Sequence, residues 1–167
     1  MQKFLKHLKF LSKATNQHGV HSPFIYGYVT KCLYTKKKHI GSKSLNALLK
    51  SIAYFNAERV ILKNGKTDVQ SIIKEYFPDI KFVSEGADVI YLSKKNISEA
   101  KDFLSKEMFV HNNTMLFVDA IYESKQTEAI WEALKLHPKV TVTVDMFYCG
   151  AVFFRREQAE EHFKIRI

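Results

Sequence analysis

Short apolar runs alternate with amphipathic stretches from residue 59 onward, and this alternation constrains the fold more than any other feature. The runs RVILKN, DVIYLS and TMLFVDA are typical of buried strands. Two of the stretches between them begin with helix-capping patterns, in which Thr67 precedes Gln70 and Asn96 precedes Glu99 by three residues. This order predicts an α/β, Rossmann-like fold, with helices on both faces of a mostly parallel sheet.

Two apolar segments near the end of the sequence, VTVTVDMF and AVFFR, are separated only by residues 148–150, which include a glycine. A link this short predicts a β-hairpin and therefore one antiparallel strand in an otherwise parallel sheet. VTVTVDMF alternates apolar and polar residues, whereas AVFFR begins with a continuous apolar run. We therefore expect the last strand to be buried on both faces and the preceding strand to be less buried.

The segment 79–92 does not fit a simple parallel sheet. It contains two strand-like runs, IKFVS and DVIYLS, with only residues 85–87 between them. Because a parallel crossover needs a dozen or more residues, either the two runs form a hairpin or one of them is irregular and lies at a sheet edge. One strand–helix unit of a complete doubly wound sheet is therefore expected to be missing here.

The basic residues of the chain are unevenly distributed. The first 57 residues contain ten of the 26 lysines and arginines and none of the 17 acidic residues. This asymmetry indicates a basic, helical N-terminal extension over residues 1–57, followed by an α/β domain over residues 58–167, the two forming one structural unit.

Residues 3–13 have the pattern of an amphipathic helix. Four lysines share one side, and Phe4, Leu8 and Leu11 share another. The favoured interpretation is a surface helix that docks its apolar side on the protein, because such helices are common. The alternative is that its lysines contact an anionic surface, either a membrane or a nucleic acid.

Several classes of protein are excluded by what the sequence lacks. No apolar stretch reaches the roughly 20 residues of a transmembrane helix, and lysines interrupt the apolar N-terminus where a signal peptide needs a continuous core. The two cysteines, Cys32 and Cys149, indicate no disulfide framework, so a reducing cytoplasm is expected. The chain also has no P-loop, no zinc pattern and no strong nucleic-acid motif.

Two stretches, HGVHSPFIY near the start and AIWEALKLHPKVTVTVDMFYCGAVFFRREQAEEHFKIRI at the end, resemble a group of bacterial class I S-adenosylmethionine (SAM)-dependent methyltransferases. The resemblance is dense over residues 110–167 and clear over residues 17–34. It implies a sheet whose last strand is antiparallel, SAM as cofactor, and methyl transfer to an acceptor that the sequence does not identify.

The resemblance also implies a set of site residues. Asn64 and Gly65 occupy the loop that wraps the cofactor after the first strand, where glycine allows close backbone approach. Glu85 occupies the position of the acid that binds the ribose hydroxyls, and Asp119 would line the reaction site. His18 and His21 offer imidazoles for general-base work, although a capping or packing role is more common for such a motif.

Four positions depart from the family pattern: Lys63, Val69, Ser93 and Ala120 stand where an acid, a glycine, an acid and a second acid are usual. Ser93 and Ala120 leave no cage of oxygen ligands, so no metal is expected. Lys63 adds positive charge near a sulfonium ligand, and Val69 adds bulk, so the sequence predicts weak or no SAM binding. The alternative function is a catalytically inactive binding module with an eroded cofactor site.

Overall fold

The computed structural model describes residues 2–36, 39, 41–63, 68–106 and 109–167. Its centre is a seven-stranded sheet in the order β2-β1-β3-β4-β6-β5-β7. β6 runs antiparallel to both of its neighbours, and every other pair of neighbouring strands is parallel. The strands are β1 (Arg59–Leu62), β2 (Lys81–Phe82), β3 (Val89–Leu92), β4 (Met115–Asp119), β5 (Val142–Asp145), β6 (Cys149–Phe153) and β7 (Glu161–Lys164).

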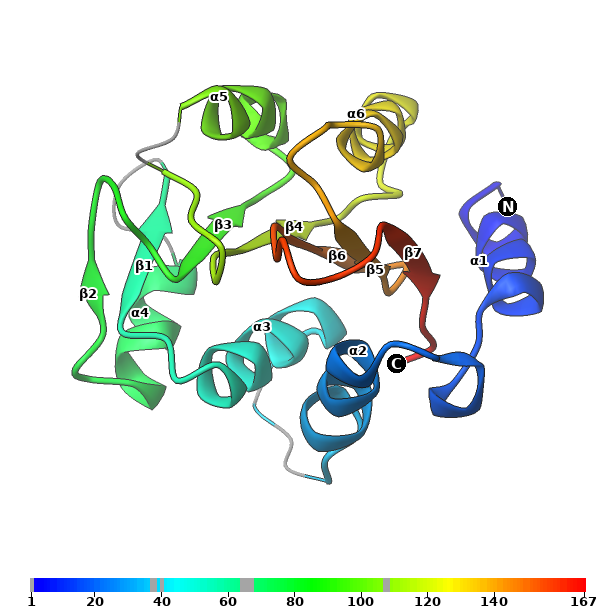
Figure 1. Cartoon of the computed structure of the whole chain (residues 1–167), viewed down its shortest axis with the longest axis horizontal. Coiled ribbons are helices and arrows are strands. Elements are labelled where there is room, and N and C mark those ends of the chain that lie inside the picture. The colour runs from blue at the N-terminus through cyan, green and yellow to red at the C-terminus, as the bar shows by residue number, and fades with distance from the viewer. Residues whose placement is uncertain (1, 37–38, 40, 64–67, 107–108) are drawn as a thin grey trace.

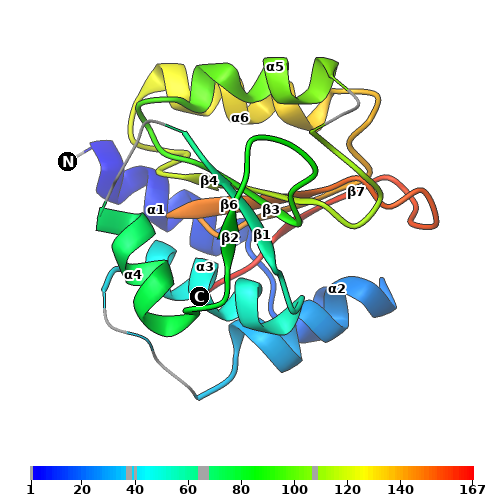
Figure 2. The same cartoon turned by 90° about the vertical axis from the view of Figure 1, so that its left-hand side faces the viewer.

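Helices cover both faces of the sheet, as the alternation of elements predicts (Figures 1 and 2). One face carries α2, α3 and α4, and the opposite face carries α5 and α6. The helices are α1 (Gln2–Lys13), α2 (Pro23–Tyr28), α3 (Lys43–Tyr54), α4 (Asp68–Tyr76), α5 (Ala100–Ser105) and α6 (Lys125–Lys135), with shorter turns η1 (Gln17–Gly19), η2 (Val29–Leu33) and η3 (Ile97–Glu99). The α/β, Rossmann-like fold is therefore confirmed.

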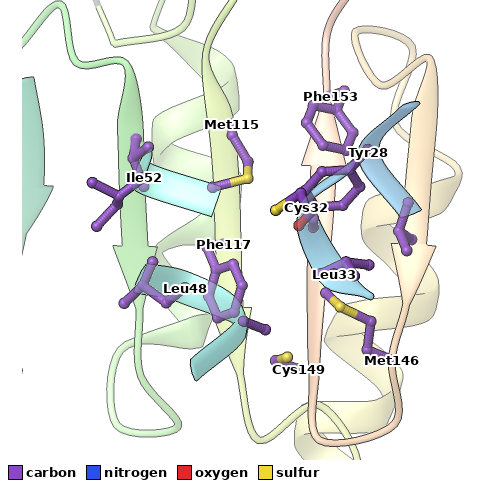
Figure 3. Close-up of a cluster of buried hydrophobic side chains, with 14 of the residues drawn as sticks. Tyr28, Cys32, Leu33, Leu48, Ile52, Met115, Phe117, Met146, Cys149 and Phe153 are labelled. Atoms are coloured by element: carbon purple, nitrogen blue, oxygen red, sulfur yellow. The ribbon is translucent and has the colours of Figure 1, made fainter. Parts of the chain in front are cut away.

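β4 shows why the middle of the sheet is buried on both sides. Met115 and Phe117 point into the core beneath α2 and α3, whereas Leu116 and Val118 point into the core beneath α5 and α6. Apolar residues at every position of a strand are typical of a strand covered on both faces. Figure 3 shows Met115 and Phe117 beside the side chains that α3 contributes to the first core.

The basic N-terminal region supplies much of that first core. Tyr28 of α2 and Leu48 and Ile52 of α3 are buried there, and the Tyr28 hydroxyl shares a hydrogen bond of 2.8 Å with Ser51. The helices expected in the N-terminal extension include α2 with η2, and α3. α2, η2 and α3 thus form much of the helical layer on this face of the sheet (Figure 1).

The C-terminal hairpin is confirmed, with two corrections. Its turn lies at residues 146–148, where Phe147 has a φ of 67°, so Cys149 and Gly150 belong to β6. β5 is as fully buried as β6, contrary to expectation. Its polar residues have internal partners, because Thr143 Oγ1 lies 2.9 Å from His162 Nδ1 and Asp145 accepts a hydrogen bond from Tyr122.

The burial of β5 follows from β7, which the sequence analysis did not anticipate. β7 pairs in parallel with the outer edge of β5, with Val142 opposite Glu161 and Asp145 opposite Lys164. The segment EHFK mixes charged and aromatic residues and has no strand-like apolar run. It becomes a strand because β5 offers it unpaired backbone groups.

β2 confirms the expected irregularity of segment 79–92, because it has only two residues and lies at the edge of the sheet. The hairpin alternative is wrong, since β2 and β3 pair in parallel with opposite sides of β1. A short link suffices because Phe82 and Val89 both stand opposite Val60, so the chain only moves sideways by two strand spacings, roughly 10 Å. Residues 83–88, all described, contain no helix, so this strand–helix unit is absent.

The side of α1 that packs against the protein is not the apolar side predicted from the sequence. Phe10 is buried against Phe147 and Tyr122, whereas Phe4 and Leu8 are 65% and 47% exposed. The lysines on the buried side form ion pairs, Lys3 with Glu123 and Lys6 with Glu128. The apolar stripe therefore faces outward except at Leu11, because aromatic contacts and ion pairs together orient the helix. Within the described residues, no helix is long and apolar enough to cross a membrane.

Candidate functional site

The candidate site lies where the parallel strands β1, β3 and β4 end. In open α/β sheets this carboxyl edge is where ligands bind, because neighbouring connections diverge there. Asp119 is the last residue of β4 and is partly exposed at this edge. Its position at the centre of the sheet makes it the described acid best placed to meet a ligand.

Two hydroxyl groups from distant parts of the chain hold the Asp119 carboxylate. Ser44 Oγ donates to Oδ1 at 2.5 Å, and Tyr91 Oη donates to Oδ2 at 3.2 Å. Ser44 lies in the first turn of α3, which begins after the N-cap Ser42, and Tyr91 lies in β3. Each carboxylate oxygen keeps a further lone pair, so the carboxylate remains able to accept a proton or a hydrogen bond.

Burial, together with the neighbouring Asp119 charge, raises the pKa of Tyr91, so Tyr91 stays protonated and remains a donor at neutral pH. Burial also raises the pKa of Cys149, which stands opposite Asp119 in the sheet. The Cys149 thiol is therefore protonated and a poor nucleophile. Asp119 is the group at this point that is suited to proton transfer.

A hollow of about 250 Å³ lies in front of Asp119. Its walls come from α1, α3 and the residues after β4 and β5, and they carry charges of both signs. The charged lining residues are Lys3, Lys43, Asp119 and Glu123. We call this space the Asp119 hollow. It is smaller than the usual range for ligand pockets, about 300–1,000 Å³, so it fits one end of a ligand.

Ala120 has a structural role at the position where the resemblance implies a second acid. Its φ is 55°, in the left-handed region that costs a non-glycine residue of order 1 kcal/mol. Its backbone N–H donates to the Tyr148 carbonyl at 2.8 Å, which joins the end of β4 to the β5–β6 turn. The chain therefore turns sharply away just after Asp119.

Asn64 and Gly65, the predicted cofactor loop, lie outside the described residues. Lys63 and Val69, the residues near this loop that depart from the family pattern, are among the described residues. Lys63 Nζ is 3.1 Å from Glu99 and 5.3 Å from the centre of the Phe103 ring, so its charge is directed toward α5. Val69 packs against the core beneath α3. Both side chains thus have described partners in the body of the protein.

Glu85, the predicted ribose-binding acid, is exposed in the link after β2. Three strand spacings, roughly 14 Å, separate β2 from β4 across the sheet. The structure therefore does not bring Glu85 and Asp119 together. A ligand that touched both would have to lie along the carboxyl edge.

The remaining candidates are Ser93, His18 and His21. Ser93 donates to Asn96 Oδ1 from both its N–H and its hydroxyl, which closes a local turn. His18 and His21 are exposed, and His18 takes part in the cap of η1 only through its backbone N–H, which donates to the Asn16 side chain. Within the described residues, no group of three His, Cys, Asp or Glu side chains could hold a metal ion.

The sequence analysis missed Ser44 and Tyr91. Ser44 is 75 residues from Asp119 and Tyr91 is 28 residues away, and no local pattern links them. A scan against protein-family models found no match for this chain, and a search of curated proteins found none either.

Proposed function

We propose that this protein is a SAM-dependent methyltransferase of class I type, with its reaction site at Asp119. The observation that carries the proposal is the sheet itself, in which the antiparallel β6 lies between β4 and β5. An antiparallel strand near the end of an otherwise parallel sheet is the arrangement implied by the resemblance of residues 110–167. The acceptor stays unidentified.

The described residues near the predicted cofactor edge are compatible with SAM. Glu85 is exposed at the end of β2, where a carboxylate can bind ribose hydroxyls. The Lys63 charge is partly offset by Glu99, which weakens the electrostatic objection to a sulfonium ligand. Val69 is turned into the core, which weakens the steric objection.

SAM supplies an electrophilic methyl group when it is bound. An acceptor O–H or N–H group that receives this methyl group must release its proton, and Asp119 is positioned to accept it. Ser44 and Tyr91 hold the carboxylate in one orientation through their hydroxyls. The small Asp119 hollow would admit the reacting end of the acceptor.

The second candidate is a catalytically inactive module that keeps the fold but not the cofactor. It is favoured by the link at residues 83–88, where no helix follows β2 to cover the adenine side of the site. The two candidates differ in one measurable property, the affinity for SAM.

Titration calorimetry of the whole chain with SAM distinguishes them. If the methyltransferase proposal is correct, SAM binds in the micromolar range and Glu85→Ala weakens binding at least about tenfold, or about 1.4 kcal/mol. Glu75→Ala is the matched control, because Glu75 is exposed at the end of α4, away from the carboxyl edge. Absence of binding heat, or equal loss in both variants, would favour the inactive module.

The alternative role of α1, contact with an anionic surface, depends on which of its lysines are available. Lys3 and Lys6 are paired with acids, whereas Lys9 and Lys13 are exposed on the outer side of the helix. We propose that any such contact uses Lys9 and Lys13, and it should weaken as the salt concentration rises.

The two free cysteines are buried thiols, which fits the proposed cytoplasmic location.

A further inference from the structure

A second cavity, of about 510 Å³, opens between the end of η2, the first half of α3 and residues 166–167. Its volume lies within the usual range for small-molecule sites. It borders the Asp119 hollow, and the two spaces share Ser42 and Lys43. We call it the basic cavity, because of the charges described next.

Three cationic side chains line the basic cavity: Lys43, Lys50 and Arg166. Its described lining residues include no aspartate or glutamate. The cavity therefore has a positive potential, which a low-dielectric wall strengthens.

Backbone carbonyl oxygens hold these cations in place. Lys50 is only 8% exposed, and its ammonium donates to the carbonyls of Leu33 and Thr35 at 2.9 and 2.8 Å. Arg166 donates from Nε and Nη2 to the Ala14 carbonyl at 3.1 and 2.8 Å. Because a carbonyl oxygen carries no full charge, the bonds to Ala14 hold Arg166 without neutralising it. Lys43 donates to a main-chain oxygen of Ile167, another lining residue, at 2.7 Å.

The rest of the lining is largely apolar. Leu33, Ala47 and Ile167 contribute aliphatic surface, and Tyr34 contributes an aromatic ring. Burial raises the pKa of Tyr34, so the phenol is neutral and adds no negative charge. A matching ligand would have an apolar body, which contacts the aliphatic lining, and an anionic head, which faces the cations.

We propose that the basic cavity binds a small organic anion, in which a carboxylate or phosphate head lies between Lys43 and Arg166 and an apolar body contacts Leu33 and Ala47. Arg166 can present a planar pair of donors to either head group. We expect this binding to be independent of SAM, because the described residues that line the cavity include neither Glu85 nor Asp119.

Calorimetric titration with four probes, in the absence of SAM, tests the proposal. Naphthalene-2-carboxylate and 2-naphthyl phosphate share an apolar body and differ in head group, naphthalene-2-carboxamide is the neutral control, and inorganic phosphate is the head alone. We expect at least one naphthyl anion to bind at least about tenfold more tightly than both controls, a difference of about 1.4 kcal/mol. The better of the two anions identifies the head group. Equal binding of the carboxamide, or no binding of either anion, would overturn the proposal.

Variants locate the binding. Lys43→Gln and Arg166→Gln should each lower the affinity for the preferred anion at least fivefold. Lys101→Gln, on the exposed surface of α5 across the sheet, should change this affinity less than twofold. Lys43 is exposed, so its variant keeps the test valid even if Arg166→Gln disturbs the contact with Ala14. Unchanged affinity in Lys43→Gln, or an equal loss in the Lys101 variant, would place the anion elsewhere and refute the assignment.

Discussion

Replacing Phe153 by alanine should remove a large part of the stability of this protein. The Phe153 side chain is 2% exposed and lies between the sheet and the helices α2 and α3 (Figure 3). Its ring centre is 5.0 Å from that of Phe24, 5.6 Å from that of Tyr28 and 5.7 Å from that of Phe55. The site is enclosed by rigid aromatic groups and by strands on both sides, so it cannot collapse around a smaller side chain.

The expected cost is about 4 kcal/mol, within the range of roughly 3–5 kcal/mol for a buried phenylalanine replaced by alanine. For a chain of this length, each kcal/mol corresponds to roughly 2–4 °C in Tm, so the variant should melt about 8–16 °C lower. Phe153→Leu keeps most of the volume and should cost about 1.5 kcal/mol or less. Leu136→Ala, at a site 83% exposed, should change stability by less than about 0.5 kcal/mol.

Urea unfolding followed by circular dichroism gives the free energy of unfolding for all four proteins. The order wild type, Leu136→Ala, Phe153→Leu, Phe153→Ala should run from most to least stable, with no change in the dependence on urea. A loss below about 1 kcal/mol in Phe153→Ala would show that β6 is not packed as described, and it would refute the reasoning from burial.

Three further predictions concern the sheet edge and the docked helix. Although partial burial opposes the shift, hydrogen bonds from the backbone of Arg59 and Glu58 lower the pKa of Asp88. Its stabilising effect is therefore present above the ordinary value of 3.8 and lost as pH falls, so Asp88→Asn should reduce the urea midpoint at pH 7 but not near pH 2. Equal losses at both pH values would contradict this. Hydrogen exchange should be fast in β2 and slow in β4, and similar protection in both would argue against a two-residue edge strand. Phe10→Ala should release α1 and speed tryptic cleavage after Lys13, whereas an unchanged cleavage rate would mean that the Phe10 contacts do not hold the helix.

Local periodicity was sufficient to predict the layers of the fold. Apolar runs such as MLFVD, continuous over both faces, identify central strands, and the short link before β6 identifies the hairpin. The same reasoning missed β7, because EHFK has no apolar pattern and depends on the edge of β5. It also misjudged β5, since Thr143 and Asp145 are polar yet paired inside the protein.

The candidate site was predictable only in part. Asp119 was predicted through the resemblance to class I methyltransferases, as the acid that follows the apolar run MLFV. Ser44 and Tyr91 carry no such signal, because their contacts with Asp119 arise only when α3 and β3 meet at the end of β4. The orientation of Lys63 toward Glu99 is likewise a tertiary effect, and it changes the electrostatic argument that the sequence suggested.

The insertion of β6 between β4 and β5 has a consequence for biosynthesis. As the chain is made from its N-terminus, β4 is complete at residue 119, but the strand that pairs with its free edge begins only at Cys149. The bridge between Thr15 and Ile165 likewise joins residues that are made far apart in time. A nascent chain therefore presents an unpaired, apolar strand edge at β4 until β6 has been made. Such an edge is where non-native pairing begins, so the chain is most vulnerable to aggregation while still on the ribosome, and most in need of chaperones then.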